Sequence, residues 1–342
     1  MMMLSIRHLF CAIILCSGIL ILVYLLNLTT TSKQHTQQTM YQWETLKQST
    51  KVVPKALYPL QNSQSQPFVE NEHEEITIAI VICGDVLQEG LTLIKSAIIF
   101  QQKHPLKFLI FTESNLIQSV EEKLSDWQVL KNHSFSFEIL NLQFPKNREK
   151  EWKTLFKKCA SQRLFFADIL PHIDSLMYMD ADSLFLGPVY DVWSHFHQMN
   201  STQMAALAIE SEDLNSAWYG RFARHPYYGK TGLNSGVMLM NLTRMRSFGW
   251  GNYLGPILKQ FKTKMVFGDQ DIINIIFYYH PETLLLFQCR FNFRTDHCRY
   301  MPNCESAMSD GVVVMHGSRA AFLSNKVPPF TLIYQAFQEV NR

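Results

Sequence analysis

The feature that most constrains the fold of this sequence is the run of residues 76–83, which is apolar apart from Thr77 and is followed at once by Gly84 and Asp85. A strand that is apolar on both faces must be covered on both faces, as parallel strands between two layers of helices are. Parallel strands are joined by crossovers, which are usually helices. The run therefore predicts the first strand of an α/β fold whose later segments alternate between helix and strand.

The segments that follow keep this alternation as far as residue 179. Apolar runs and helical spacing predict, in order, a helix at 91–100, a strand at 106–111, a helix at 116–124, a strand at 135–142, a long helix at 152–170 and a strand at 175–179. We therefore expect a mostly parallel, open sheet whose ligands bind beyond the carboxyl ends of the strands. The second half is less regular, with strands predicted at 204–209, 237–240 and 311–315.

Two carboxylates, Asp180 and Asp182, come directly after the predicted strand at 175–179. At the end of a strand they offer hard oxygen ligands, which suit Mg²⁺ or Mn²⁺ bound to the phosphates of a nucleotide. A second Asp-x-Asp pattern, at 269–271, precedes the apolar residues 272–277 and so lies at the start of a predicted buried helix. We therefore assign the metal to the first pair. The alternative is that both aspartates only cap a turn.

Composition and charge exclude several classes of protein. The chain has 342 residues, of which 47% are hydrophobic and 18% charged, which is typical of a globular protein with a large core. Its 31 basic and 29 acidic side chains nearly cancel, and no Lys/Arg tract is present. A nucleic-acid partner is therefore not indicated. Small polar or modestly charged substrates remain open.

The amino-terminal segment predicts a membrane anchor. Residues 9–26 carry no charged side chain and as a helix would span about 27 Å, enough to cross a thin bilayer. We predict a cytoplasmic tail at 1–8, a transmembrane signal-anchor at 9–26, a polar stem at 27–74 and a lumenal catalytic domain at 75–342, a type II arrangement. A cleaved signal peptide is the alternative, but no small-residue cleavage pattern follows the apolar stretch.

Glycosylation sequons also indicate a lumenal domain. They occur at Asn27, Asn132, Asn200 and Asn241. Asn27 lies close to the predicted anchor, and Asn241 follows an apolar run that would bury it. We predict glycans at Asn132, Asn200 and Asn241, of which the first two are the better placed.

Five cysteines lie outside the predicted anchor, at positions 83, 159, 289, 298 and 304. Because five is odd, at least one is unpaired or pairs with another chain. Cys298 and Cys304 flank a short loop and predict a local disulfide, for which Cys289 can compete. Cys83 reads as a buried thiol or as half of a long-range disulfide. Metal binding by these thiols is disfavoured, since no Cys-x-x-Cys spacing occurs.

Several long passages resemble one family. They are CASQRLFFADIL, DSLMYMDADSLFLGPVYDVW, RFARHPYYGKTGLNSGVMLMNLTRMR, GDQDIINIIFYYHPE, NFRTDHCRYMPNCESA and VVVMHGSR. Over residues 76–335 the chain resembles glycosyltransferase family 8, and within it the glucoside xylosyltransferases of the secretory pathway. The resemblance implies a GT-A fold, a type II protein of the Golgi or endoplasmic reticulum, and a divalent metal. It also implies transfer of xylose from UDP-xylose, with retention, to O-linked glucose on EGF-like repeats in α1,3 linkage.

The resemblance also implies roles for individual residues. The metal ligands would be Asp180, Asp182 and His316, and an imidazole among oxygen ligands favours Mn²⁺, with Mg²⁺ as the alternative. The catalytic residues would be Gln270, Asp269 and Asp182. The donor would be bound by Gly84, Asp85, Arg163, Asp180, Asn234, Ser235, Gly236, Asp271, Gly317, Arg319 and Lys326. Either Arg319 or Lys326 would supply a phosphate contact, and we favour Lys326.

Two further clusters predict the acceptor site. One is the aromatic and cationic loop formed by Trp218, Tyr219, Arg221, Arg224, His225, Tyr227 and Tyr228, which without the resemblance would read as surface packing. The other is the polar cluster formed by Asn292, Arg294, Asp296 and His297.

Some positions depart from the family's pattern. Ala181 stands where threonine is usual, and Ser318 stands where asparagine is usual. Residues 209–213 replace a Pro-Glu-His-Glu-like stretch, and residues 247–263 are shorter than in the family. The changes at 209–213 and 247–263 concern the acceptor more than catalysis. Three alternative functions remain open: a transferase with a glucose or galactose donor, a non-catalytic membrane-anchored glycan or peptide receptor, and a phosphohydrolase.

Overall fold

The computed structural model of the chain describes residues 74–340, apart from 102, 130–134, 154, 156–158 and 300–301. The predicted tail, anchor and most of the predicted stem lie outside the described residues, as do the sequons at Asn27 and Asn132. None of the helices that the structure describes is long and apolar enough to span a bilayer.

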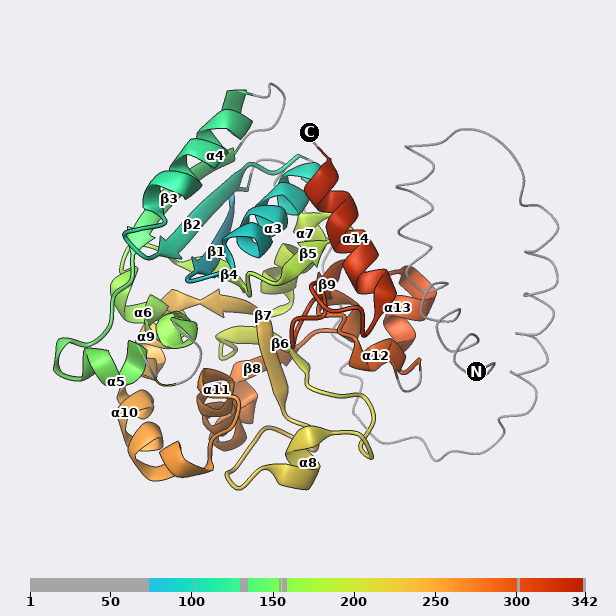
Figure 1. The fold of residues 1–342 in the computed structure, drawn as a ribbon. Helices are drawn as coiled ribbons and strands as arrows, with labels where there is room; N and C mark the ends of the chain where they lie inside the picture. Colours follow the sequence, from blue (N-terminus) through green and yellow to red (C-terminus); the bar gives the residue numbers. More distant parts are fainter. Residues whose placement is uncertain are drawn as a thin grey trace, which may run out of the picture. The chain divides into compact units, whose positions relative to one another are not determined.

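A seven-stranded sheet forms the centre of the described part of the chain (Figure 1). Its order is β3-β2-β1-β4-β7-β6-β8. The strands are β1 (Ile76–Ile82), β2 (Leu106–Thr112), β3 (Phe135–Asn141), β4 (Ser175–Met179), β6 (Ala205–Ile209), β7 (Leu233–Asn241) and β8 (Leu284–Leu286). β1 to β4 are parallel, β7 is antiparallel to both neighbours, and β8 is parallel to β6. The sheet is therefore mixed but mostly parallel, as predicted.

Alternate residues of β1 pack into two hydrophobic cores, one on each face of the sheet. Ile78 and Ile80 contact the core that includes α3 (Leu87–Ile99) and α4 (Ile117–Val129). Ala79 and Val81 contact the core that includes α9 (Leu242–Phe248), α10 (Trp250–Phe261) and α11 (Asp269–Tyr279). Every residue of β1 is buried. This double burial is why the strand is apolar throughout rather than at every second position.

A second, two-stranded antiparallel sheet joins distant parts of the chain. It pairs β5 (Ser183–Phe185) with β9 (Val314–His316), so β9 is shorter than the strand predicted at 311–315. The remaining α-helices are α5 (Glu149–Lys153), α6 (Phe166–Ile169), α7 (Val189–Trp193), α8 (Trp218–Phe222), α12 (Asp296–Arg299), α13 (Glu305–Asp310) and α14 (Pro328–Glu339). α14 lies beside α3, where Lys95 Nζ donates to the carbonyls of Phe337 and Gln338.

The long helix predicted at 152–170 is wrong. The structure has α5, then a 3-10 helix at Ala160–Phe165, then α6. The interruption lies at Cys159, which has a φ of 65° and therefore cannot continue a right-handed helix. Cys159 forms a disulfide with Cys83 at the end of β1. Its conformation is therefore determined by the sheet and not by the apolar spacing of its neighbours.

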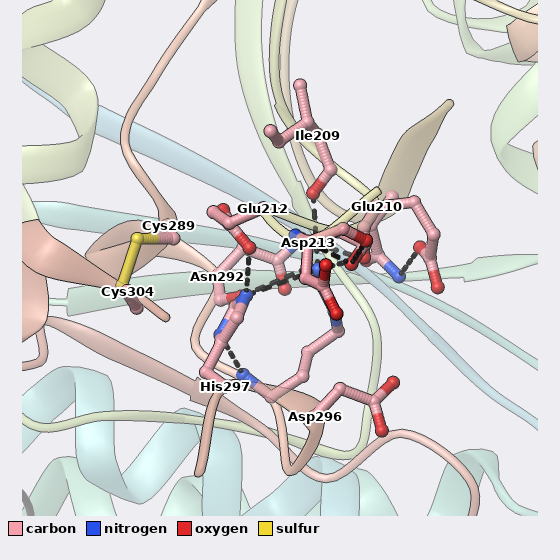
Figure 2. A network of polar contacts seen from close by, with 12 residues as sticks. Ile209, Glu210, Glu212, Asp213, Cys289, Asn292, Asp296, His297 and Cys304 are labelled. Atoms are coloured by element: carbon pink, nitrogen blue, oxygen red, sulfur yellow. Dashed lines mark hydrogen bonds and ion pairs between the residues drawn. A yellow bond between two sulfur atoms is a disulfide. The ribbon is translucent and has the colours of Figure 1, made fainter. Parts of the chain in front are cut away.

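The local disulfide predicted between Cys298 and Cys304 is also wrong, because Cys304 pairs with Cys289 (Figure 2). The Cα atoms of Cys289 and Cys304 are 5.8 Å apart, which suits a disulfide. Cys298 lies in α12 with its sulfur 3.6 Å from the carbonyl of Thr295. Of the two alternatives for Cys83, a buried thiol or half of a long-range disulfide, the structure has the second.

Loss of the Cys83–Cys159 disulfide should destabilise the protein strongly. This disulfide closes 76 residues of chain, whereas Cys289–Cys304 closes 15. Since longer loops lose more entropy on cross-linking, the double variant Cys83→Ala/Cys159→Ala should lower the free energy of unfolding by about 2–4 kcal/mol, and Cys289→Ala/Cys304→Ala by less. Urea unfolding of both variants measures this. Equal stability of wild type and the first variant would contradict the expectation.

Candidate active site

Three segments bring Asp180, Asp182 and His316 together. Asp180 follows β4, Asp182 precedes β5 and His316 ends β9. The backbone N–H of Asp180 donates to the carbonyl of Gly236 at 2.7 Å, and that of Gly317 donates to the carbonyl of Asp182 at 2.6 Å. The pairing of β5 with β9 therefore places the histidine beside the two carboxylates.

The side chains of this triad converge. His316 Nε2 lies 3.5 Å from Asp180 Oδ2 and 3.4 Å from Asp182 Oδ1. One ligand atom from each residue lies within 4.8 Å of the others. Two carboxylates and an imidazole at this spacing fit a divalent cation that accepts oxygen and nitrogen ligands. The structure thus brings together the three residues predicted as metal ligands.

The triad is electrostatically coupled. Burial acts to lower the pKa of His316, but its contacts with Asp180 and Asp182 raise it to about 9. Burial acts to raise the pKa of Asp180, but Arg163, His316 and Tyr178 together lower it well below the ordinary range. Without a metal, His316 is therefore protonated at neutral pH, and its positive charge lies beside the two carboxylates.

Gly236 makes room for His316. A Cβ atom added at Gly236 would lie 2.0 Å from Cε1 of the imidazole, so no other residue fits without moving the ring. The resemblance had implied that this glycine binds the donor. The group that approaches it in the structure is the metal-site histidine.

Arg163 connects the loop that carries Asp180 to α11. It is 5% exposed and lies in the 3-10 helix Ala160–Phe165. Its Nε donates to Asp269 Oδ2, and its Nη1 donates to Asp180 Oδ1 at 3.0 Å and to the carbonyl of Ser235 at 2.6 Å. The guanidinium also lies over the Tyr178 ring, 4.5 Å from its centroid.

The amide of Gln270 is oriented by several partners. Its Oε1 accepts from the backbone N–H of Ser235 at 3.1 Å and from the Ser235 hydroxyl at 3.3 Å. Its Nε2 lies 3.3 Å from the hydroxyl of Tyr219 and 3.5 Å from Glu210 Oε2. Gly268, with a φ of 71°, turns the chain into α11 just before this residue. Gln270 is partly exposed, so the described structure leaves it accessible near the triad.

The two aspartates beside Gln270 are buried. Asp269 is 3% exposed, and burial raises its pKa although Arg163 opposes this. Asp271 is fully buried, and its Oδ1 accepts from the Tyr219 hydroxyl at 2.7 Å. Its Oδ2 accepts from the backbone N–H groups of Val266 and Phe267. Asp271 therefore holds the loop before α11 in place from the protein interior.

Asn234, Ser235 and Gly236 lie within β7, which begins earlier than the strand predicted at 237–240. These three residues are therefore part of the strand and not of a turn before it. Asn234 is 5% exposed and Ser235 1% exposed. Ser235 contacts Gln270, as described above, whereas the side chain of Asn234 donates to Glu210.

The other predicted donor residues are exposed, except for Gly317, which is buried. Gly84 and Asp85 follow β1, and the N–H of Gly84, which has a φ of 67°, donates to Glu113 Oε2. Gly317 packs against the Phe322 ring, which a Cβ would meet at 2.6 Å. Arg319 is paired with Asp296, and Lys326 is exposed. The structure does not choose between these two cations.

The aromatic loop predicted for the acceptor packs largely around Asp271. Tyr219 is 1% exposed, and His225 Nε2 lies 3.3 Å from Asp271 Oδ1. Trp218 packs against Phe267, with ring centroids 4.4 Å apart. The exposed members are Arg221 and Arg224.

The second predicted acceptor cluster is mostly interior (Figure 2). Arg294 is fully buried, and its Nη2 donates to the carbonyls of Ile209 and Glu210. His297 Nδ1 accepts from the N–H of Arg294, so its Nε2 bears the proton that faces Glu212 Oε2 at 2.7 Å. Burial lowers the pKa of His297, and Glu212 opposes this. These residues hold the 209–213 segment in place.

Three features of the site were not predicted from the sequence: Glu210, Tyr178 and the link from Asn292 to His316. Glu210 directly follows β6, and Tyr178 lies one residue before the end of β4. Glu210 could have been found from its place at a strand end, where ligand-binding residues gather. The contact of Asn292 with His316 joins segments 24 residues apart and had no signal in the sequence.

Two of the predicted glycosylation sites lie in the described structure. Asn200 is exposed, and its Oδ1 accepts from the hydroxyl of Thr202 at 2.7 Å. Asn241 is partly buried and caps α9, where its Oδ1 accepts from the N–H of Arg244. Modification at both positions stays a prediction.

Residues 77–314 match the family model described as glycosyl transferase family 8. Human glucoside xylosyltransferase 1 is 47% identical over 276 residues, which cover 78% of this chain and 62% of the human protein. The mouse protein of the same name is 46% identical, with coverage of 78% and 68%. Mouse glucoside xylosyltransferase 2 is 44% identical, with coverage of 77% and 62%. The chain thus spans less than two thirds of the length of the human relative.

Solved structures share the fold at low sequence identity. Mouse xyloside xylosyltransferase 1 in its apo form has a TM-score of 0.53 and 14% identity, covering 72% of this chain and 98% of that one. The galactosyltransferase LgtC, in complex with donor and acceptor sugar analogs, has a TM-score of 0.57 and 16% identity, with coverage of 78% and 96%. These likenesses support the α/β, GT-A-like fold. The family match and the relatives of 44–47% identity show that the chain belongs to glycosyl transferase family 8, in its glucoside xylosyltransferase subfamily.

Proposed function

We propose that this protein is a retaining, metal-dependent glycosyltransferase that moves xylose from UDP-xylose to glucose O-linked on EGF-like repeats, forming an α1,3 bond. The donor and acceptor follow from the names of its relatives and from the resemblance of its sequence. The observation that carries the proposal is the convergence of Asp180, Asp182 and His316 within 4.8 Å, with Asp180 linked through Arg163 and Ser235 to the partly exposed Gln270.

The triad would hold Mn²⁺, because two carboxylates with one imidazole suit this ion better than Mg²⁺. When bound, the ion would offset the negative charge that gathers on the phosphates of the departing UDP. Arg163 adds positive charge nearby and fixes Asp180 in place through Nη1. Arg319 or Lys326 would contact the phosphates from the carboxyl-terminal segment.

Gln270 would support the reacting carbon of the donor sugar. A neutral amide is a poor nucleophile, so we assign it electrostatic support of an oxocarbenium-like state, with the acceptor hydroxyl attacking from the face that UDP leaves. The Ser235 contacts hold Oε1 of this amide in a fixed direction. Asp269, anchored by Arg163, would bind a hydroxyl of the donor sugar.

We also infer a place in the secretory pathway. The two disulfides of the described structure suit an oxidising compartment. A type II arrangement with the anchor at 9–26 would place the catalytic domain in the lumen of the Golgi or endoplasmic reticulum, where Asn132, Asn200 and Asn241 can be glycosylated.

A panel of donors tests the reaction. The full chain with Mn²⁺ and an O-glucosylated EGF repeat should transfer xylose from UDP-xylose in preference to the sugars of UDP-glucose and UDP-galactose, with the product identified by mass spectrometry. Asp182→Asn should reduce transfer by about a hundredfold or more, because it removes a charged metal ligand. The control Asp126→Asn changes an exposed aspartate of α4 and should leave transfer unchanged.

Each other outcome of the panel favours an alternative. Preference for UDP-glucose would contradict the choice of donor. Binding of UDP without turnover of any donor would favour a non-catalytic receptor. Loss of UDP-xylose without any need for acceptor would favour a hydrolase.

Metal affinity should depend on pH. Because contacts with Asp180 and Asp182 raise the pKa of His316 to about 9, a metal must displace a proton at any lower pH. The affinity for Mn²⁺ at saturating UDP should therefore rise by up to about tenfold per pH unit between about pH 7 and 9, as measured by electron paramagnetic resonance of free Mn²⁺. An affinity independent of pH in this range would argue against His316 as a ligand.

Replacement of Gln270 should slow the chemical step. Gln270→Ala removes an amide whose oxygen is held in one direction, so kcat should fall by about a hundredfold while KM for UDP-xylose changes little. Steady-state kinetics with the glucosylated acceptor measure both constants. An unchanged kcat would remove Gln270 from the mechanism but leave the metal site untouched.

A further inference from the structure

One continuous chain of hydrogen bonds joins the carboxylate of Glu210 to the imidazole of His316. Asn234 Nδ2 donates to Glu210 Oε2 at 2.7 Å. Asn292 Nδ2 donates to Asn234 Oδ1 at 2.8 Å. His316 Nδ1 lies 2.9 Å from Asn292 Oδ1. Figure 2 shows Glu210 and Asn292 at this network. These hydrogen bonds therefore connect the segment after β6 to His316 through the side-chain amides of Asn234 and Asn292.

The direction of the first amide is fixed by two groups that cannot exchange roles. A carboxylate such as Glu210 only accepts, and the backbone N–H of Gly236 only donates. Gly236 N–H donates to Asn234 Oδ1 at 3.0 Å. The amide of Asn234 can satisfy both neighbours in only one orientation, with its NH₂ toward Glu210 and its oxygen toward Gly236.

The orientation of the Asn234 amide in turn fixes the orientation of Asn292 and the position of the proton on His316. Because the oxygen of Asn234 accepts, Asn292 must present its NH₂ to it, and its own oxygen then faces His316. An amide oxygen only accepts, so the proton of a neutral His316 must be on Nδ1. The lone pair of Nε2 is then directed toward Asp180 and Asp182, the position of a metal ligand.

The surroundings make a reversal of this chain costly. Asn234, Asn292 and His316 are 5%, 0% and 3% exposed, so water cannot replace a lost partner. Arg294 donates from Nη1 to the backbone carbonyl of Asn292 and from Nη2 to that of Glu210. One buried guanidinium thus holds the backbone at two members of this hydrogen-bond chain, Glu210 and Asn292.

We propose that Glu210, Asn234 and Asn292 are positioning residues that fix His316 as the Nδ1–H tautomer, with Nε2 as its metal-binding nitrogen. The inference rests on the proposed function, since it takes the triad as a metal site. Metal-bound histidines in general donate their second nitrogen to an oxygen acceptor. In this protein, the orientation of that acceptor is in turn dictated by a carboxylate from another segment.

Two replacements of Asn292 test the inference. Asn292→Leu keeps the volume but removes the acceptor, so the affinity for Mn²⁺ at saturating UDP should fall by about ten- to a hundredfold. Asn292→Asp keeps an oxygen that accepts from Nδ1–H, but its other oxygen then faces the accepting Oδ1 of Asn234, so its affinity should lie between those of Asn292→Leu and wild type. Isothermal titration of the full chain with Mn²⁺ and UDP measures both. The control Asn252→Leu alters an exposed asparagine of α10 and should bind as wild type does.

A measurement on the wild type is independent of whether the variants fold. With Cd²⁺ and UDP bound, a nitrogen-15 correlation spectrum should show the His316 ring proton on Nδ1, and His316→Gln assigns the signal. A proton on Nε2 would overturn the inference. So would wild-type affinity in folded Asn292→Leu, or an affinity in Asn292→Asp as low as in Asn292→Leu.

Failure of the inference and failure of the proposed function give different results. If Asp182→Asn binds Mn²⁺ with UDP as tightly as wild type does, the triad is not the metal site and the proposed function fails. If Asp182→Asn loses binding while Asn292→Leu keeps it, the metal site stands and only the positioning role is lost.

Discussion

The rest of the site depends on the buried ion pairs of Arg163. A guanidinium that is 5% exposed is stable only when its charge is paired, and its partners are Asp180 after β4 and Asp269 at the start of α11. Burial acts to lower the pKa of Arg163, but these two carboxylates raise it, so the side chain stays charged. One rigid group contacts both carboxylates. It therefore holds the loop that carries Asp180 at a fixed separation from α11, the helix that carries Gln270.

Strand β7 carries the second constraint, because its backbone determines the orientation of side chains from α11 and β9 and of its own Asn234. The N–H of Ser235 orients Gln270, the N–H of Gly236 orients Asn234, and the missing side chain of Gly236 admits the His316 ring. Backbone groups cannot rotate or exchange donor for acceptor, so they are the most reliable references that a protein can offer to amides and imidazoles. The polarity of the site is therefore set by the sheet, and the side chains follow it.

What the sequence could predict was what depends on local pattern. Burial on both faces makes β1 apolar throughout, and a strand end followed by Asp180 is visible in the chain itself. What it could not predict depends on partners far away. Cys159 adopts a left-handed conformation in a disulfide with a strand 76 residues earlier, and Cys304 pairs with Cys289 rather than with the nearer Cys298. Likewise, no pattern in the sequence links Asn292 to a metal-site histidine.

Residues 209–213 depart from the family's Pro-Glu-His-Glu-like pattern. The contacts of this segment with Arg294, Asn234 and His297 show which of its atoms the site uses. Arg294 contacts the carbonyls of positions 209 and 210, which any residue supplies. The side chains in use are those of Glu210 and Glu212, and both remain glutamates in this chain. Ser211 bonds only within its own turn, to Asp213 and Ser216. The changed side chains are therefore those that the site does not need, so the departure is compatible with an intact metal centre.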